Sequence, residues 1–157
     1  MIKYLVMDVD GTLTDGKIYM GNDGEMMRAF SIKDGYGIHD ILIPAGITPV
    51  IITGRTSKIL EKRCSEIGIK EIHQGVSNKI DSLSLITNNL SNVAYIGDDI
   101  NDLSAMKPIK DSGGIIGCPA DAVQKVKDIA DFISLKNGGD GAVREFTEWI
   151  VGDKSLV

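Results

Sequence analysis

An apolar run near the amino terminus ends in an acidic turn, and this junction constrains the fold more than any other feature. Residues Tyr4-Leu5-Val6-Met7 lack the polar alternation of a half-exposed strand, so they predict a parallel strand buried on both faces. The carboxyl end of such a strand lies where open α/β folds bind ligands. The next residues, Asp8-Val9-Asp10-Gly11, place two carboxylates and a turn there. We interpret them as part of an acidic pocket; the alternative is an ordinary acidic turn.

Apolar runs alternate with helical patterns along most of the 157 residues, which predicts an α/β fold with a parallel sheet between layers of helices. The length fits one domain, residues 1–157. A β-hairpin is expected within residues 17–31, around the turn Gly21-Asn22-Asp23-Gly24, and a loop followed by an amphipathic helix within about 138–152. Further strands are expected at 49–53, 71–74, 93–96, 113–117 and 132–134, and helices at 36–44, 57–67, 77–90, 102–106 and 120–126.

Composition argues against several classes of protein. A net charge of −5 without a Lys/Arg-rich run disfavours nucleic-acid binding. No apolar stretch approaches the roughly 18 residues of a membrane span, so no membrane partner is expected. The start lacks a signal-peptide pattern, and the two cysteines, Cys64 and Cys118, form no disulfide framework or metal spacing. We therefore expect a cytoplasmic protein with reduced thiols.

Polar residues also follow several of the other predicted strands. Each has an ordinary explanation, as a strand end, a solvated helix residue or a surface turn. Because parallel strands end at one edge of a sheet, their common placement instead indicates one site. The set comprises Asp8 and Asp10, the segment Thr53-Gly54-Arg55, Lys79, and the segment Gly97-Asp98-Asp99-Ile100-Asn101-Asp102.

These residue types suit phosphoryl transfer. A carboxylate that attacks a phosphate dianion meets charge repulsion, so a hard cation is needed between them, and carboxylates favour Mg²⁺. Asp8 can then act as the nucleophile and form an aspartyl-phosphate. Asp10 can protonate the leaving alkoxide and later activate water. Thr53 and Lys79 can stabilise charge on the transferring phosphoryl group.

The same segments, in the same order, resemble the four motifs of the haloacid dehalogenase (HAD) superfamily of phosphatases. The resemblance implies a three-layer, Rossmann-like fold with Asp8 as nucleophile. It also implies Asp10 as acid/base, with a backbone carbonyl that helps to hold Mg²⁺. Asp98 is then a metal ligand, and Asp99 and Asp102 support the site. A regulatory receiver domain gathers similar residues, but its acidic pair precedes the phosphoacceptor.

Further segments resemble the capless branch of this superfamily, which hydrolyses phosphate esters of sugar acids. They are Leu13-Thr14-Asp15-Gly16, Lys33-Asp34-Gly35-Tyr36-Gly37-Ile38, Gln74-Gly75-Val76-Ser77-Asn78-Lys79 and Gly141-Ala142-Val143-Arg144-Glu145-Phe146. The connections after Gly16 and Thr53 leave no room for an inserted cap domain. The resemblance favours 3-deoxy-D-manno-octulosonate 8-phosphate as substrate.

Two alternatives stay open. Lys33 stands where octulosonate enzymes commonly have Arg, and the segment Gly117-Cys118-Pro119-Ala120-Asp121-Ala122 is closer to relatives that act on nonulosonate (sialic-acid-type) 9-phosphates. The substrate could therefore be a nonulosonate 9-phosphate. The other alternative is a phosphate-binding module without catalytic activity.

A capless site is open to water and offers little surface for recognising a sugar acid. The expected hairpin has an apolar-rich arm, and an isolated hairpin is marginal in water, so we expect copies of the chain to pair through it. The family resemblance implies a homotetramer in which neighbouring subunits complete each site. Gly54, Arg55, Lys33 and Arg144 are the candidate substrate-binding residues, since an anionic ligand needs cations.

Overall fold

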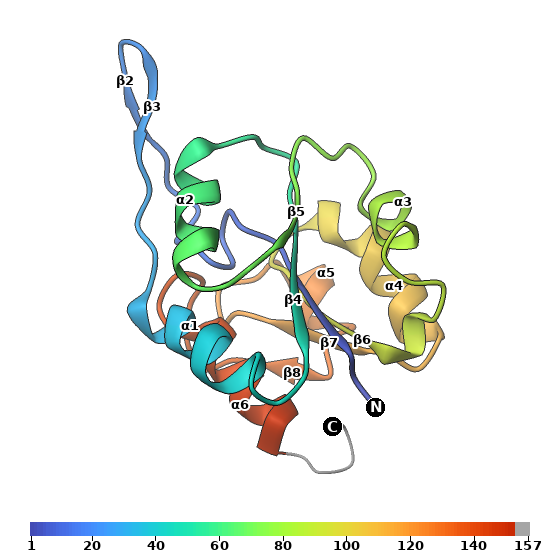
Figure 1. The fold of residues 1–157 in the computed structure, drawn as a ribbon. Helices are drawn as coiled ribbons and strands as arrows, with labels where there is room; N and C mark the ends of the chain where they lie inside the picture. The colour runs from blue at the N-terminus through green and yellow to red at the C-terminus, as the bar shows by residue number, and fades with distance from the viewer. Residues whose placement is uncertain (153–157) are drawn as a thin grey trace.

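The computed structural model describes residues 1–152; the last five residues of the expected domain, 153–157, lie outside it. A six-stranded parallel sheet forms its centre, in the order β5-β4-β1-β6-β7-β8 (Figure 1). The predicted α/β architecture is confirmed. The strands are β1 (Tyr4–Met7), β4 (Thr48–Ile52), β5 (Glu71–His73), β6 (Val93–Ile96), β7 (Ile115–Cys118) and β8 (Phe132–Ile133).

Alternate residues of the central strands enter two separate cores, which explains why these strands are apolar throughout. In β1, Leu5 and Met7 pack on one face and Val6 on the other. The first face is covered by α2 (Lys58–Glu66), α6 (Ala142–Gly152), and α1 (Ile32–Tyr36) with the π-helix η1 (Gly37–Leu42). The second is covered by α3 (Lys79–Ser84), α4 (Leu103–Asp111) and α5 (Gln124–Lys127). These are the three predicted layers.

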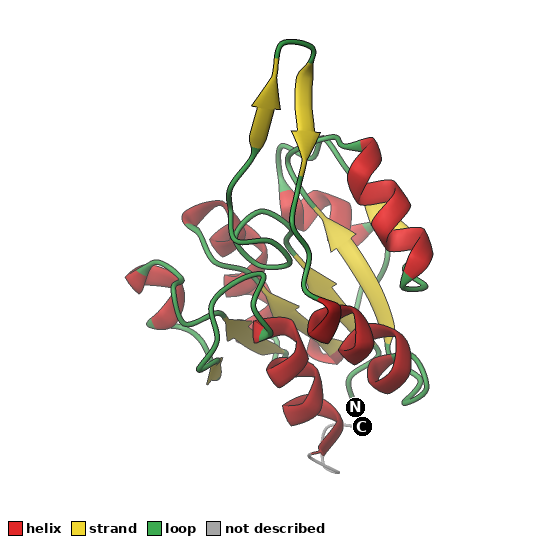
Figure 2. Ribbon diagram, turned by 90° about the vertical axis from the view of Figure 1, so that its left-hand side faces the viewer, coloured by secondary structure: helices red, strands yellow, loops and turns green. Residues whose placement is uncertain are grey.

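The expected hairpin stands away from this body (Figures 1 and 2). It consists of β2 (Tyr19–Gly21) and β3 (Gly24–Met27), which pair only with each other. Three of its methionines, Met20, Met26 and Met27, are each more than half exposed. Within residues 1–152, the connections after β1 and β4 contain no inserted folded unit apart from this hairpin, as predicted for a capless chain.

Four predicted helices have wrong bounds, and the one expected at 102–106 continues to Asp111 in α4. The helix expected at 36–44 begins four residues earlier, because the Ser31 side chain caps it by accepting the Lys33 N–H. The helix expected to reach residue 90 ends at Ser84. Beyond it, the side chains of Thr87 and Asn89 bind nearby backbone N–H groups and compete with helical hydrogen bonding.

The helix expected at 120–126 is limited to α5. The Val123 N–H donates to the Asp98 carbonyl, so the chain before α5 is tied to the loop after β6 instead of coiling. The short 3-10 helix η2 (Leu90–Asn92) precedes β6, and η3 (Ile100–Asp102) precedes α4. No helix in residues 1–152 combines the length and the apolar character that a membrane span would need.

The C-terminal loop is packed tightly against the turn that follows β1. The Gly139 N–H donates to the Thr12 carbonyl at 3.0 Å. A side chain at Gly138 would place its Cβ 1.8 Å from the Gly11 carbonyl oxygen, so only glycine permits this approach. Residues far apart in the sequence thus hold the acidic turn in place.

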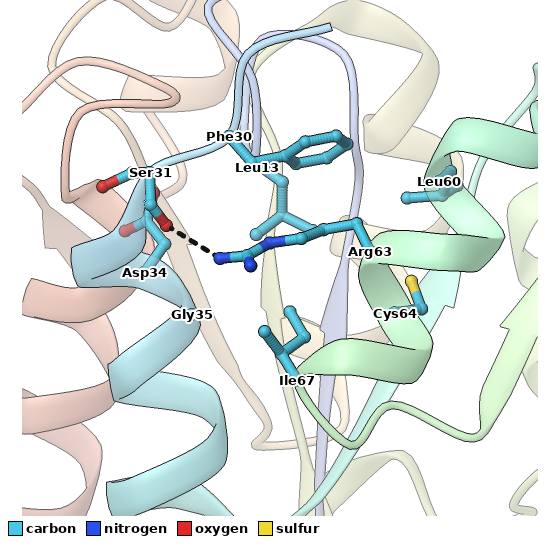
Figure 3. A pocket seen from close by; sticks show the side chains of 9 residues that line it. All are labelled: Leu13, Phe30, Ser31, Asp34, Gly35, Leu60, Arg63, Cys64 and Ile67. Carbon is cyan, nitrogen blue, oxygen red and sulfur yellow. Dashed lines mark hydrogen bonds between the residues drawn. The ribbon is translucent and has the colours of Figure 1, made fainter.

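Asp34 anchors the helix that follows this loop. Its carboxylate is buried and accepts the Arg144 N–H, in the first turn of α6, at 2.9 Å. Burial raises the pKa of Asp34 to about 6. Figure 3 shows its surroundings, a cavity of about 10 Å³ between α1 and α2, where the Arg63 guanidinium reaches back to the Ser31 carbonyl. This contact joins α2 to the segment that carries Asp34.

We expect Gly138→Ala to destabilise the protein by roughly 2–4 kcal/mol, because its methyl group would overlap the backbone at Gly11. Gly152→Ala is the control, since its Cβ meets no atom of residues 1–152 within 4 Å. Chemical denaturation of both variants measures the difference in the free energy of unfolding. Equal stabilities would show that the loop yields without cost.

Candidate active site

Three neighbouring strands end at the candidate site. The carboxyl end of β1 lies between those of β4 and β6, with Met7 paired to Ile51 on one side and Ile96 on the other. Asp8, Thr53 and Asp98 follow these ends within two residues. The sheet register therefore brings together the polar residues that the sequence placed after separate strands.

Lys79 links two carboxylates beneath this edge. It is the first residue of α3, and its side chain is only 3% exposed. Its ammonium Nζ donates to Asp8 Oδ1 at 2.6 Å and to Asp102 Oδ1 at 2.7 Å. The pKa of Lys79 is raised, because the negative charges of Asp102 and Asp8 outweigh the opposing effect of burial. Lys79 is thus a fixed cation against the predicted nucleophile.

Asp102 orients the loop after β6. Its fully buried carboxylate accepts the backbone N–H groups of Asp98 and Asp99 at 3.0 and 3.1 Å, and the Tyr95 hydroxyl at 2.7 Å. The exposed Asp99 accepts the Ile100 N–H and so caps η3. Asp99 and Asp102 therefore shape the loop after β6, and Asp102 also holds Lys79 in place.

A metal ion would fit between Asp8 and Asp98. One carboxylate oxygen from each of Asp8, Asp98 and Asp102 lies within 4.8 Å of the other two. The Thr12 hydroxyl donates to Asp98 Oδ1 at 3.1 Å. A Cβ at Gly11, whose φ is +87°, would lie 2.1 Å from Asp98 Oδ2, so this carboxylate sits directly on the turn after β1. This hard-oxygen donor set matches Mg²⁺.

The acidic cluster is electrostatically unsatisfied without a cation. Burial and the nearby charge of Asp102 raise the pKa of Asp8 to about 6, even though Lys79 lowers it. Burial and repulsion from Asp8 and Asp102 raise the pKa of Asp98 to about 8. A bound dication would favour the ionised form of both side chains.

Asp10 faces an adjacent pocket. Its carboxylate lies 3.1 Å from the Arg28 guanidinium and 3.9 Å from Arg55 Nε. Thr53 is buried, whereas Gly54 and Arg55 are exposed. The pocket is lined by Asp8, Asp10, Thr53, Gly54, Arg55, Asp99 and Asn101. The predicted nucleophile Asp8, a second carboxylate and the cation Arg55 thus share one opening.

Several proteins of known name are similar to this chain in sequence. The chain is 42% identical over 154 residues to the 3-deoxy-D-manno-octulosonate 8-phosphate phosphatase KdsC of Escherichia coli K12, which covers 96% of this chain and 79% of that protein. It is 41% identical to the KdsC of Yersinia pestis, over 96% of this chain and 80% of that protein. The chain belongs to this phosphatase family. No protein-family model matches it.

Solved structures of the family have the same fold. One is the 3-deoxy-D-manno-octulosonate 8-phosphate phosphatase of Moraxella catarrhalis, in complex with a magnesium ion, a phosphate ion and 3-deoxy-D-manno-octulosonate (KDO). It gives a TM-score of 0.88 at 39% identity, and the match covers 96% of this chain and 86% of that one. The cobalt-bound form of the Haemophilus influenzae phosphatase gives a TM-score of 0.88 at 35% identity, and the match covers 98% of this chain and 90% of that one. The acidic cluster of this chain accords with the metals in both structures.

Two predicted substrate-binding residues of this family member lie away from the pocket. Lys33 is exposed at the start of α1. The Arg144 guanidinium lies 4.9 Å from the centre of the Tyr36 ring and pairs with Glu148 at 2.7 Å. Neither residue lines the pocket that holds Asp8 and Asp10. Their role in substrate binding stays a prediction.

Sequence reasoning missed Arg28 and Tyr95. Arg28 follows Met26 and Met27 in the return arm of the hairpin, and its position three residues after Glu25 was the available signal. Tyr95 belongs to the apolar strand β6, and its ring packs in the hydrophobic core. Only its hydroxyl group contacts the site, by donating a hydrogen bond to Asp102. No spacing in the sequence indicates the hydrogen bond between Tyr95 and Asp102.

We expect Mg²⁺ affinity to fall as pH is lowered. Below the raised pKa of Asp98, about 8, the site carries a proton that the metal must displace, so affinity drops by up to about tenfold per pH unit. Calorimetric titration of Mg²⁺ at pH 6 to 9, in buffers of different ionisation enthalpy, measures affinity and proton release together. Affinity that is constant over this range, without proton release, would contradict the expectation.

Proposed function

We propose that the chain hydrolyses 3-deoxy-D-manno-octulosonate 8-phosphate through an aspartyl-phosphate intermediate on Asp8, with Mg²⁺ as cofactor. One observation carries the mechanism: Asp8 lies at the end of the central strand, held by Lys79 at 2.6 Å and opening into a pocket beside Asp10. The substrate follows from the KdsC relatives, which cover nearly the whole chain at 42% identity.

Asp8 is the group that attacks phosphorus. One of its oxygens forms the new bond to phosphorus as the bond between phosphorus and the ester oxygen breaks. Lys79 Nζ, already bound to Asp8 Oδ1, stabilises negative charge at this point. When bound between Asp8 and Asp98, Mg²⁺ neutralises the charge repulsion between the carboxylate and the phosphate.

Asp10 serves both halves of the reaction. It gives its proton to the departing alkoxide of the sugar acid, and its carboxylate then accepts a proton from the attacking water. The water oxygen bonds to phosphorus, phosphate leaves, and Asp8 is restored as a carboxylate. Thr53, Gly54 and Arg55 border the same pocket and are suited to bind the phosphate group.

We also propose that the chain forms a homotetramer and is located in the cytoplasm. The hairpin exposes Met20, Met26 and Met27, an apolar surface that a second copy of the chain could cover. In such an assembly, Lys33 and Arg144 would meet the substrate of a neighbouring subunit. Both cysteines, Cys64 and Cys118, are free and buried, which accords with a reducing compartment.

Asp8→Asn tests the nucleophile. The amide is nearly isosteric but a very poor nucleophile, so we expect turnover of octulosonate 8-phosphate to fall by at least about a thousandfold. Phosphate release measures turnover, and a nonulosonate 9-phosphate measured beside it with the unaltered protein tests the alternative substrate. Substantial activity in folded Asp8→Asn protein would refute the assignment.

Met26→Asp tests the assembly. A charge in a buried hairpin interface should shift the protein to smaller species and lower kcat/KM for the sugar-acid phosphate by about tenfold or more. Leu85→Asp, at another exposed apolar residue, directly after α3, should leave the mass unchanged. Light scattering at assay concentration gives the mass, and a fully active monomer of the unaltered protein would exclude shared sites.

A further inference from the structure

Arg28 is a buried cation that the mechanism above does not use. It follows β3 in the return arm of the hairpin, and its side chain is only 1% exposed. Its Nη1 lies 3.1 Å from Asp10 Oδ1. Burying a guanidinium costs several kcal/mol unless anionic groups compensate it, so its placement beside Asp10 demands an explanation.

Glu25 and Ser57 hold Arg28 in this position. Arg28 Nε pairs with Glu25 Oε1, and the other oxygen of Glu25 accepts the Ser57 hydroxyl at 2.8 Å. Ser57 is also the N-cap of α2, the helix beside the hairpin in Figure 1. Although burial would raise the pKa of Glu25, its contacts with Arg28 and Ser57 lower it. A charged chain of contacts therefore runs from α2 through the hairpin to Asp10.

The geometry distinguishes the two oxygens of Asp10. Oδ1 forms an ion pair with Arg28 Nη1 at 3.1 Å, whereas Arg55 Nε lies 3.9 Å from Oδ2, beyond hydrogen-bonding distance. The contact with Arg28 is an ion pair whose geometry is not that of a hydrogen bond, and it holds Oδ1 beside the guanidinium. Oδ2 is then the oxygen left to give and take a proton. Arg28 does not line the pocket, so it acts through Asp10 rather than on the substrate.

We propose that Arg28 is a positioning residue that fixes the Asp10 carboxyl group for proton transfer to the leaving group, with Glu25 as its anchor. The inference rests on the proposed function and extends it to the hairpin. It makes the hairpin part of the catalytic machinery of its own subunit, independently of any assembly that the hairpin forms.

Leaving-group dependence separates positioning from general structural support. A sugar-acid phosphate has an alkoxide leaving group that needs a proton, whereas p-nitrophenyl phosphate has a stable phenolate that does not. Because kcat/KM covers the steps up to formation of the aspartyl-phosphate, Arg28→Met should lower it about 10- to 100-fold for octulosonate 8-phosphate. For p-nitrophenyl phosphate it should fall by less than about threefold, and Arg28→Lys should restore part of the difference.

Three further variants make the experiment decisive. Glu25→Gln keeps the arginine but weakens its anchor, so it should give a smaller loss with the same substrate dependence, and it decides the question if Arg28→Met does not fold. In an Asp10→Ala background, Arg28→Met should cause no further selective loss. Lys110→Met, which removes an exposed cation paired with Asp131, is the matched control and should change neither substrate's kcat/KM.

The outcomes distinguish a failure of the proposed Arg28 role from a failure of the proposed phosphatase function. Equal losses on both substrates, or a selective loss that persists without Asp10, would overturn the role of Arg28 and leave the phosphatase assignment intact. Failure of the unaltered protein to hydrolyse either ester in the presence of Mg²⁺ would overturn the proposed function itself.

Discussion

The ammonium group of Lys79 is the charge on which the site depends. It lies between Asp8 and Asp102, and with the half-buried Asp98 these carboxylates form a cluster in which negative charge exceeds positive. Burying carboxylates without compensation is costly, so Lys79 makes the cluster tolerable in the folded protein. It does not complete the compensation, as the raised pKa values of Asp8 and Asp98 indicate. The residual charge is what gives the site its affinity for a divalent cation.

Much of this arrangement could be predicted because it depends on strand ends. Apolar strands buried on both faces are easily recognised, and residues directly after parallel strands must converge, which places Asp8, Thr53 and Asp98 together. Helix ends were less predictable. The early end of α3 depends on side-chain hydrogen bonds from Thr87 and Asn89, local competition that an apolar pattern does not reveal.

Contacts between distant segments were beyond sequence reasoning for a different reason. Gly138 reads as part of a loose glycine-rich loop, yet it lies against the backbone of Gly11. Arg28 reads as a surface charge on a hairpin, yet its guanidinium is buried beside Asp10. In both cases the residue type is compatible with several environments, and only the tertiary fold selects one. The candidate nucleophile could therefore be predicted, whereas the groups that position its neighbours could not.

The central place of β1 has a consequence for biosynthesis. Tyr4 pairs with Thr48 on one side and with Val93 on the other, so β1 receives its second neighbour only after all the residues between β1 and β6 have been made. Until then, its apolar residues and one hydrogen-bonding edge stay open, and exposed edges promote association between chains. Long-range pairing of this kind also slows folding. A nascent chain interrupted before β6 would therefore carry the nucleophile without a site and be prone to aggregate.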